Sequence, residues 1–245
     1  MIAELVSQGF TVNMNDFAEN AKIGDLLDKL LNQKDTMKNP HISNSKKRAF
    51  VREYKPGKTF ANQPDIDSQC RDSIVETLAV SFTEYEDVVQ AIDMTKKTMS
   101  QIILGRMEQF KTMPGLLYVA GFTNNDPDGP FEALVPDISA AVLGHSATVP
   151  PAPGVDDPKY YILEEVMEKS FSADGGTEPD NKCFVLALIS AKHDITNGGD
   201  RIKLLLLLQK ALADGAKRLG FTMMRAMNTS LATQVYFVPV LPIKQ

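Results

Sequence analysis

Hydrophobic residues recur with a helical period along most of this chain, and the densest pattern lies between Gly199 and Gly220. Asp200 is a favourable N-cap, and Gly220 is a favourable residue just after a helix C-terminus. Apolar residues leave almost no polar face across the first half of this segment: Ile202, Leu204, Leu205, Leu206, Leu207, Leu208, Ala211 and Leu212. A helix that is apolar all round is normally buried all round. The sequence therefore predicts a buried central helix over about 200–219, with other elements packed around it.

The N-terminal third has a different pattern. Residues 1–13 are semi-apolar, which fits an arm or an edge strand. Asn15 or Asp16 can cap a predicted amphipathic helix that runs to about residue 33. Its apolar residues follow the spacing i, i+3, i+4, i+7, i+8 and form one stripe: Ile23, Leu26, Leu27, Leu30 and Leu31. A single stripe fits packing either on the chain's own core or on a neighbouring subunit.

Residues 35–65 form the longest polar stretch, and several prolines interrupt it. More than thirty residues without an obvious element exceed the usual loop of a compact domain. We therefore predict an extended basic linker that contains a short strand at Arg48–Tyr54. Residues 1–65 are then an N-terminal arm, amphipathic helix and basic linker, and residues 66–245 are the core domain.

Helical signals dominate the start of the core domain. A helix is predicted over about 67–81, and Thr83–Glu86 then has the sequence of a capping box for a second helix that ends near residue 111. Further helices are predicted over about 136–143 and from Asp157-Pro158 onward, with proline at the first helical position.

Other segments of the core leave their class open. Periodicity cannot decide whether the apolar runs 116–122 and 183–190 are strands or buried helices. Residues 234–238 fit an edge strand or an extended tail, and the proline-rich stretch 146–158 is the candidate internal boundary. The predicted fold class is mainly α, a helical domain around the buried helix at 200–219, with a few short β-strands and extended terminal arms.

Composition agrees with a globular protein in a reducing compartment. Of the 245 residues, 43% are apolar and 23% are charged, and there are eleven Met but no Trp, which favours adaptable helical packing. Two distant cysteines, Cys70 and Cys183, argue against a disulfide framework. The N-terminus lacks a signal-peptide pattern, and no stretch approaches the ~20 apolar residues of a membrane span. We expect a cytoplasmic (intracellular) or virion protein without a membrane span.

Charge is distributed unevenly along the chain. Residues 34–60 contain eight Lys or Arg against two acidic residues, a local charge of +6, whereas the whole chain carries −5. Phe50, Tyr54 and Phe60 interleave with these cations, which offers phosphate partners and stacking faces together. The predicted nucleic-acid-binding residues are Lys46, Lys47, Arg48, Arg52, Tyr54, Lys55 and Lys58. The alternative is a solvated loop or a clamp on an acidic neighbouring subunit.

Other motifs give weaker signals. Residues 124–129 place oxygen-bearing side chains at the first, third and fifth positions of a calcium loop, but Val135 stands where its bidentate glutamate belongs. Gly198-Gly199-Asp200 precedes a helix and suits a phosphate, yet Asp200 already supplies the negative charge, and no glycine-rich nucleotide motif surrounds it. Three His and two Cys are too scattered for a metal site. We therefore predict no catalytic, cofactor-binding or metal-binding residues and no enzyme.

These features favour a non-enzymatic, self-assembling structural protein that packages or contacts RNA or single-stranded DNA, as viral nucleocapsid and coat proteins do. Exchange of terminal arms is a low-cost route to such homo-oligomers. The alternative is a helical adaptor or scaffold that binds another protein. A less favoured alternative is an enzyme whose site forms only in three dimensions.

Overall fold

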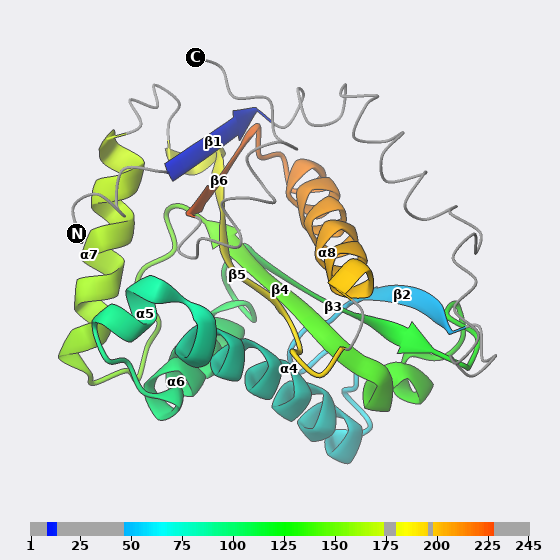
Figure 1. Cartoon of the computed structure of the whole chain (residues 1–245). Helices are drawn as coiled ribbons and strands as arrows, with labels where there is room; N and C mark the ends of the chain where they lie inside the picture. Colours follow the sequence, from blue (N-terminus) through cyan, green and yellow to red (C-terminus); the bar gives the residue numbers. More distant parts are fainter. Residues whose placement is uncertain (1–8, 14–46, 174–179, 196–197, 228–245) are drawn as a thin grey trace.

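The computed structural model describes residues 9–13, 47–173, 180–195 and 198–227, and its centre is a mixed β-sheet (Figure 1). The strands lie in the order β1-β6-β5-β4-β3-β2, and β5 and β6 are parallel while every other neighbouring pair is antiparallel. Their bounds are β1 Gly9–Asn13, β2 Arg48–Glu53, β3 Gly115–Thr123, β4 Ile138–Ser146, β5 Cys183–Ala191 and β6 Met223–Met227. Within the described residues, β1 and β2 are therefore the two edges of the sheet.

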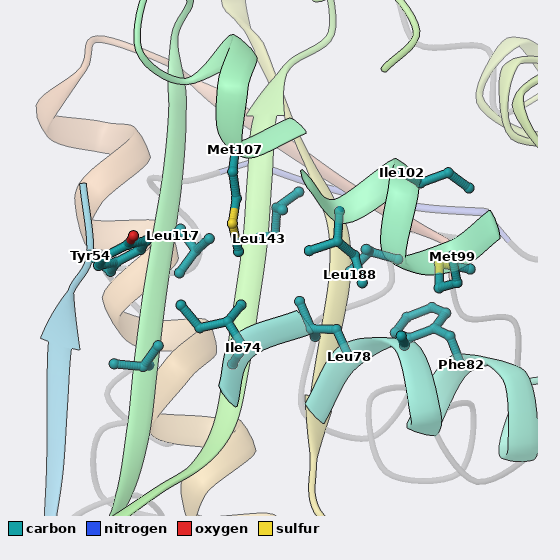
Figure 2. Close-up of a cluster of buried hydrophobic side chains, with 14 of the residues drawn as sticks. Tyr54, Ile74, Leu78, Phe82, Met99, Ile102, Met107, Leu117, Leu143 and Leu188 are labelled. Atoms are coloured by element: carbon teal, nitrogen blue, oxygen red, sulfur yellow. The ribbon is translucent and has the colours of Figure 1, made fainter. Parts of the chain in front are cut away.

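Helices cover both faces of this sheet. The helices are α4 Pro64–Tyr85, α5 Asp87–Ala91, α6 Lys96–Gln109, α7 Pro158–Ala173 and α8 Gly198–Arg218, and short 3-10 turns occupy Phe131–Asp137 and Asp180–Lys182. The helices α4 and α6 lie against one face and α8 lies against the other (Figure 1). Each face has its own buried apolar cluster. Figure 2 shows the cluster under α4 and α6, where Leu78 of α4 lies next to Leu188 of β5.

The prediction of a mainly helical fold is wrong, because six strands form the centre of the described molecule. The apolar runs 116–122 and 183–190 are strands, and 138–146 is a strand where a short helix was predicted. In β3, Leu117 and Val119 face the α4 cluster while Leu116 and Tyr118 face the α8 cluster. A strand that is buried on both faces reads as a continuous apolar run, so the period-two pattern of a strand is absent from the sequence.

The predicted helix at 200–219 is confirmed as α8, but its place in the fold is different. It crosses one face of the sheet, with β2, β3, β4 and β5 as its main packing partners, rather than standing at the centre of a bundle. Leu204, Leu208 and Leu212 are fully buried against the strands. Gly144 of β4 permits this approach, since a Cβ there would lie 2.8 Å from the Val185 carbonyl oxygen and 3.1 Å from Leu212.

The segment from α4 to α6 breaks where one helix was predicted. Thr83 does not cap a helix, because its hydroxyl donates to the Ala79 carbonyl within α4 at 2.8 Å. The N-cap lies at Thr95, whose Oγ1 accepts a hydrogen bond from the Thr98 N–H at 3.1 Å. The predictions of a helix starting at Asp157-Pro158 and of a strand at Arg48–Tyr54 are confirmed by α7 and β2.

Several predictions fall outside the described residues. These include the amphipathic helix to residue 33, Lys46 and the strand or tail at 234–238. Within the described part, β1 is an edge strand, as one of the two interpretations of residues 1–13 expected. None of the described helices is long and apolar enough to cross a membrane.

Candidate functional site

The basic residues predicted to act together are divided between the two ends of β2. Arg48 pairs with Thr123, the last residue of β3, whereas Glu53 pairs with Tyr118 further back along that strand. Lys47 and Arg48 are exposed at one end of the sheet, and Lys55 and Lys58 are exposed beyond the other end of β2. Seven residues of extended chain separate Arg48 from Lys55, roughly 20 Å at about 3.3 Å per residue. One short ligand segment therefore cannot meet all of these cations at one point.

The two arginines of β2 hold the turn that follows β3. The Arg48 guanidinium lies 3.5 Å from the Asp126 carboxylate and donates to the Asn125 carbonyl oxygen at 3.4 Å. Arg52 donates to the carbonyl oxygens of Pro127 and Gly129. The turn at residues 124–129, which resembles the start of a calcium loop, is thus bound by the basic residues of β2. Carbonyl oxygens of this turn already accept hydrogen bonds from Arg48 and Arg52. No group of three or more His, Cys, Asp or Glu in the described residues could hold a metal ion.

The aromatic residues of the basic segment are core residues, so the prediction that they offer stacking faces is wrong. Phe50 is 2% exposed, Tyr54 1% and Phe60 5%. The Tyr54 hydroxyl donates to Asp67 Oδ1 at 2.8 Å, and burial is the main reason why the pKa of Tyr54 is raised. Tyr54 therefore leaves the set of candidate nucleic-acid-binding residues.

Other cations lie at the same end of the sheet as Lys47 and Arg48. This end is where β3 and β5 finish and where β2, β4 and α8 begin, because Ala191 pairs with Ala140 and the Lys192 N–H donates to the Ser139 carbonyl oxygen at 2.8 Å. The Lys203 ammonium in α8 lies 5.9 Å from the centre of the Phe122 ring. Phe122 pairs with Ala49 of β2, so Lys203 is brought beside the start of the edge strand.

The first turn of α8 contributes a cluster built from three separate elements. His193, after β5, stacks on Tyr85 at the end of α4, with ring centres 3.4 Å apart. Two nitrogens of the Arg201 guanidinium lie 3.2 and 3.3 Å from the two ring nitrogens of His193. A neutral imidazole accepts at one nitrogen only, so one of these contacts is a hydrogen bond and the other is close packing. Burial, followed by the charge of Arg201, lowers the pKa of His193 below its usual value.

We call the end of the sheet formed by Lys47, Arg48, Lys192, Arg201 and Lys203 the cationic end. The positive end of the α8 helix dipole points there as well. Asp126 and Asp200 lie in the same region and reduce its charge, Asp126 by pairing with Arg48. An arrangement of several cations and a helix N-terminus binds anions, phosphate groups in particular.

No protein-family model, curated protein or solved structure matches this chain. The activity is therefore inferred from the cationic end itself. Sequence reasoning did not include Lys192, Arg201 or Lys203 among the candidate residues, although Gly198-Gly199-Asp200 was the signal that could have directed attention to them.

A second polar cluster is buried under α6 and stabilises the proline-rich connector. Arg106 is 4% exposed, and its guanidinium lies 2.9 Å from the Glu164 carboxylate of α7 and 2.6 Å from the Pro150 carbonyl oxygen. Gln109 donates to the carbonyl oxygens of Pro150 and Pro151, each at 3.0 Å. Each of these groups is satisfied by the protein itself, so we assign the cluster to stability.

Proposed function

We propose that this protein contacts the phosphate groups of RNA or single-stranded DNA at the cationic end and that it does so as a non-enzymatic, self-associating protein. One observation carries the proposal: cations that are far apart in the sequence, Arg48 from β2 and Arg201 and Lys203 from α8, lie at one end of the sheet. The first turn of α8 adds the positive end of its dipole. Neutralising phosphates with such groups releases counterions, which favours binding.

The proposed contact is made with the backbone of the nucleic acid rather than with its bases. Phe50, Tyr54 and Phe60 are buried, so none of these three rings is open to a base. Contacts to phosphate carry no sequence information. Binding is therefore expected to show little base preference and to be similar for RNA and single-stranded DNA.

The test measures the affinity for a labelled single-stranded oligonucleotide of about 12 nucleotides. Fluorescence anisotropy at increasing salt concentration gives this affinity. The double variant Lys47→Gln/Arg48→Gln should bind more weakly, and its salt slope should fall by about 0.7 for each phosphate that the variant no longer neutralises. The matched control, Lys55→Gln/Lys58→Gln, removes two exposed cations at the other end of β2 and should bind like wild type. Equal losses in the two variants, or binding that does not depend on salt, would reject the proposed site.

A small phosphate-bearing molecule is the second candidate ligand. The crossover from β5 through α8 to β6 joins the parallel pair of the described sheet, and ligands of α/β sheets bind beyond the carboxyl ends of parallel strands. Competition with a nucleoside triphosphate separates the two sources of phosphate. If micromolar triphosphate displaces the oligonucleotide, the small molecule is favoured as the ligand. If displacement needs concentrations at which simple salt has the same effect, the nucleic acid is favoured. If neither the oligonucleotide nor the triphosphate binds, the alternative of an adaptor that binds another protein is favoured.

Self-association is tested on the full chain by its native mass over a range of concentrations. The proposal expects a mass above that of one 27.0 kDa chain, with dissociation on dilution. A ratio of absorbance at 260 and 280 nm reports co-purified nucleic acid in the same sample. A single chain at every concentration would remove the assembly part of the proposal without affecting the phosphate site.

A further inference from the structure

The helix α8 carries a second stripe on the side that turns away from the sheet. Residues at spacings of four and three form it: Ile202, Leu206 and Gln209. At about 100° per residue these positions lie about 100° to 160° around the helix from Leu208, which is fully buried against the strands. Gln209 is 7% exposed, and Ile202 and Leu206 are half-buried. The main described partners of α8 are strands, which lie on its other side.

Ile202 and Leu206 need a different partner. Neither residue belongs to the two apolar clusters that the described residues form. An apolar stripe on the outer side of a helix is normally covered by another element or by a partner. The sequence pattern that made α8 apolar all round in its first half thus reflects two separate packing surfaces.

We propose that residues 16–33 of the same chain form the predicted amphipathic helix and pack their single stripe on this second stripe of α8. The segment lies outside the described residues. Its apolar residues Ile23, Leu27 and Leu30 recur at the spacing that interdigitating helices use.

Charge supports the same pairing. Lys210 and Lys217 lie seven residues apart along α8, and this spacing places them on its outer side next to Leu206, where Lys210 also pairs with Asp214 at 2.6 Å. Residues 16–33 contain four acidic and two basic residues, a net charge of −2. A net acidic segment therefore meets a surface on which Lys210 and Lys217 outnumber Asp214.

The path of the chain brings the segment to this place. The strand β1 ends at Asn13 on one edge of the sheet, and β2 begins at Arg48 on the opposite edge. The connection crosses five strand spacings, about 24 Å at about 4.8 Å each. The helices α4 and α6 already cover one face, whereas α8 lies between β1 and β2 on the other (Figure 1). Eighteen helical residues span about 27 Å, which matches the crossing.

The occupant is the chain's own segment rather than that of a second copy. Both ends of the segment are joined to strands of one sheet, which gives it a high effective concentration at α8. A segment exchanged with a neighbouring subunit would have to leave both edges of its own sheet.

Disulfide formation between paired cysteines in the full chain tests the contact. Leu206→Cys is combined in turn with Ile23→Cys, Leu27→Cys and Leu30→Cys, while the native Cys70 and Cys183 are fully buried. The control pair is Leu206→Cys with Asp28→Cys, on the polar side of the segment. Because a disulfide forms only when the Cα atoms approach within about 7 Å, at least one stripe pair should form an intramolecular bond about ten-fold faster than the control.

Two results would overturn the proposal. Disulfides that form only between chains would place the segment of a second copy on α8, and stripe pairs no faster than the control would show that residues 16–33 do not cover it. Hydrogen exchange gives an independent readout: Leu27→Asp should accelerate exchange of α8 amides, and the polar-side variant Asp28→Asn should not. No nucleic acid enters these measurements, so the proposed function is tested separately.

Discussion

The two faces of the sheet are covered in different ways. On the face of α4 and α6, side chains from helices and strands close over one another, and the buried polar cluster around Arg106 satisfies its own groups. On the opposite face one long helix crosses the strands, keeps a second apolar stripe on its outer side and begins with half-buried cations. The first face is covered by described helices, whereas the second face supplies both surfaces for which we propose a partner.

The largest expected loss of stability comes from a substitution at Arg106, on the face covered by α4 and α6. Replacing Arg106 with alanine leaves the Glu164 carboxylate and the Pro150 carbonyl without their cation, and breaking a buried pair in this way costs about 3–5 kcal/mol. Urea unfolding followed by circular dichroism measures the change. A loss below about 1 kcal/mol, the usual value for an exposed pair, would mean that the cluster does not stabilise this face.

Large-to-small substitutions compare the two packing surfaces directly. Leu78→Ala in α4 and Leu208→Ala in α8 each remove a fully buried side chain, and each should lower the free energy of unfolding by about 2–5 kcal/mol. Leu207→Ala, at a half-buried position of α8, should cost less than either. Equal costs at Leu207 and Leu208 would be inconsistent with a helix that packs on the sheet along one side.

His145 is buried on the face covered by α4 and α6, and it should make the stability of the protein depend on pH. Its Nδ1–H donates to the Ser146 carbonyl oxygen at 2.9 Å, and its Nε2 has no hydrogen-bond partner among the described residues. Burial, with a smaller contribution from Arg106, lowers the pKa of His145 from 6.5 to about 4. The folded protein therefore binds fewer protons than the unfolded chain between these values, and stability falls as the pH decreases through them.

The expected loss between pH 6.5 and pH 4 is about 3 kcal/mol, since each pKa unit corresponds to about 1.4 kcal/mol. Urea unfolding of His145→Gln should show a flatter dependence over this interval. His193→Gln is the matched control, because His193 is exposed and its variant should retain most of the wild-type slope. Parallel profiles for wild type and His145→Gln would show that another group titrates.

The smallest effect is expected from an exposed ion pair. The Lys96 ammonium lies 2.7 Å from the Glu76 carboxylate, and both side chains are more than half exposed. Lys96→Ala should change the free energy of unfolding by about 0–1 kcal/mol, because solvent screens such pairs. A cost close to that of Arg106→Ala would remove the distinction between the buried cluster and surface charge.

Sequence signals such as capping residues and apolar density predicted the position of a helix correctly where the signal lies within that one helix. Capping residues and apolar density located α8, and Asp157-Pro158 located the start of α7. Periodicity left β3 and β5 undecided between strand and helix, and β4 was predicted as a helix, because helices bury both faces of these strands and β4 has no alternating polar residues to identify it. The length of an apolar run and its flanking turns were the only signals there, and they fit a helix equally well.

The candidate site was predictable only in part, because it is assembled across the sheet. Lys47 and Arg48 were among the predicted residues, but no local pattern relates them to Arg201 and Lys203 more than 150 residues later. The burial of Tyr54 involves α4, whose Asp67 accepts the hydrogen bond of the Tyr54 hydroxyl. Such long-range contacts are set by topology rather than by local sequence.

The central claim is that anions bind where α8 begins, and one binding measurement tests it most directly. Affinity for the labelled oligonucleotide is compared among wild type, Arg201→Gln/Lys203→Gln and Lys96→Gln/Lys97→Gln. The control pair removes two exposed cations from the first turn of α6, on the opposite face of the sheet. The claim predicts weaker binding and a smaller salt slope for the α8 variant alone. Wild-type affinity in that variant, or an equal loss in the α6 variant, would contradict it.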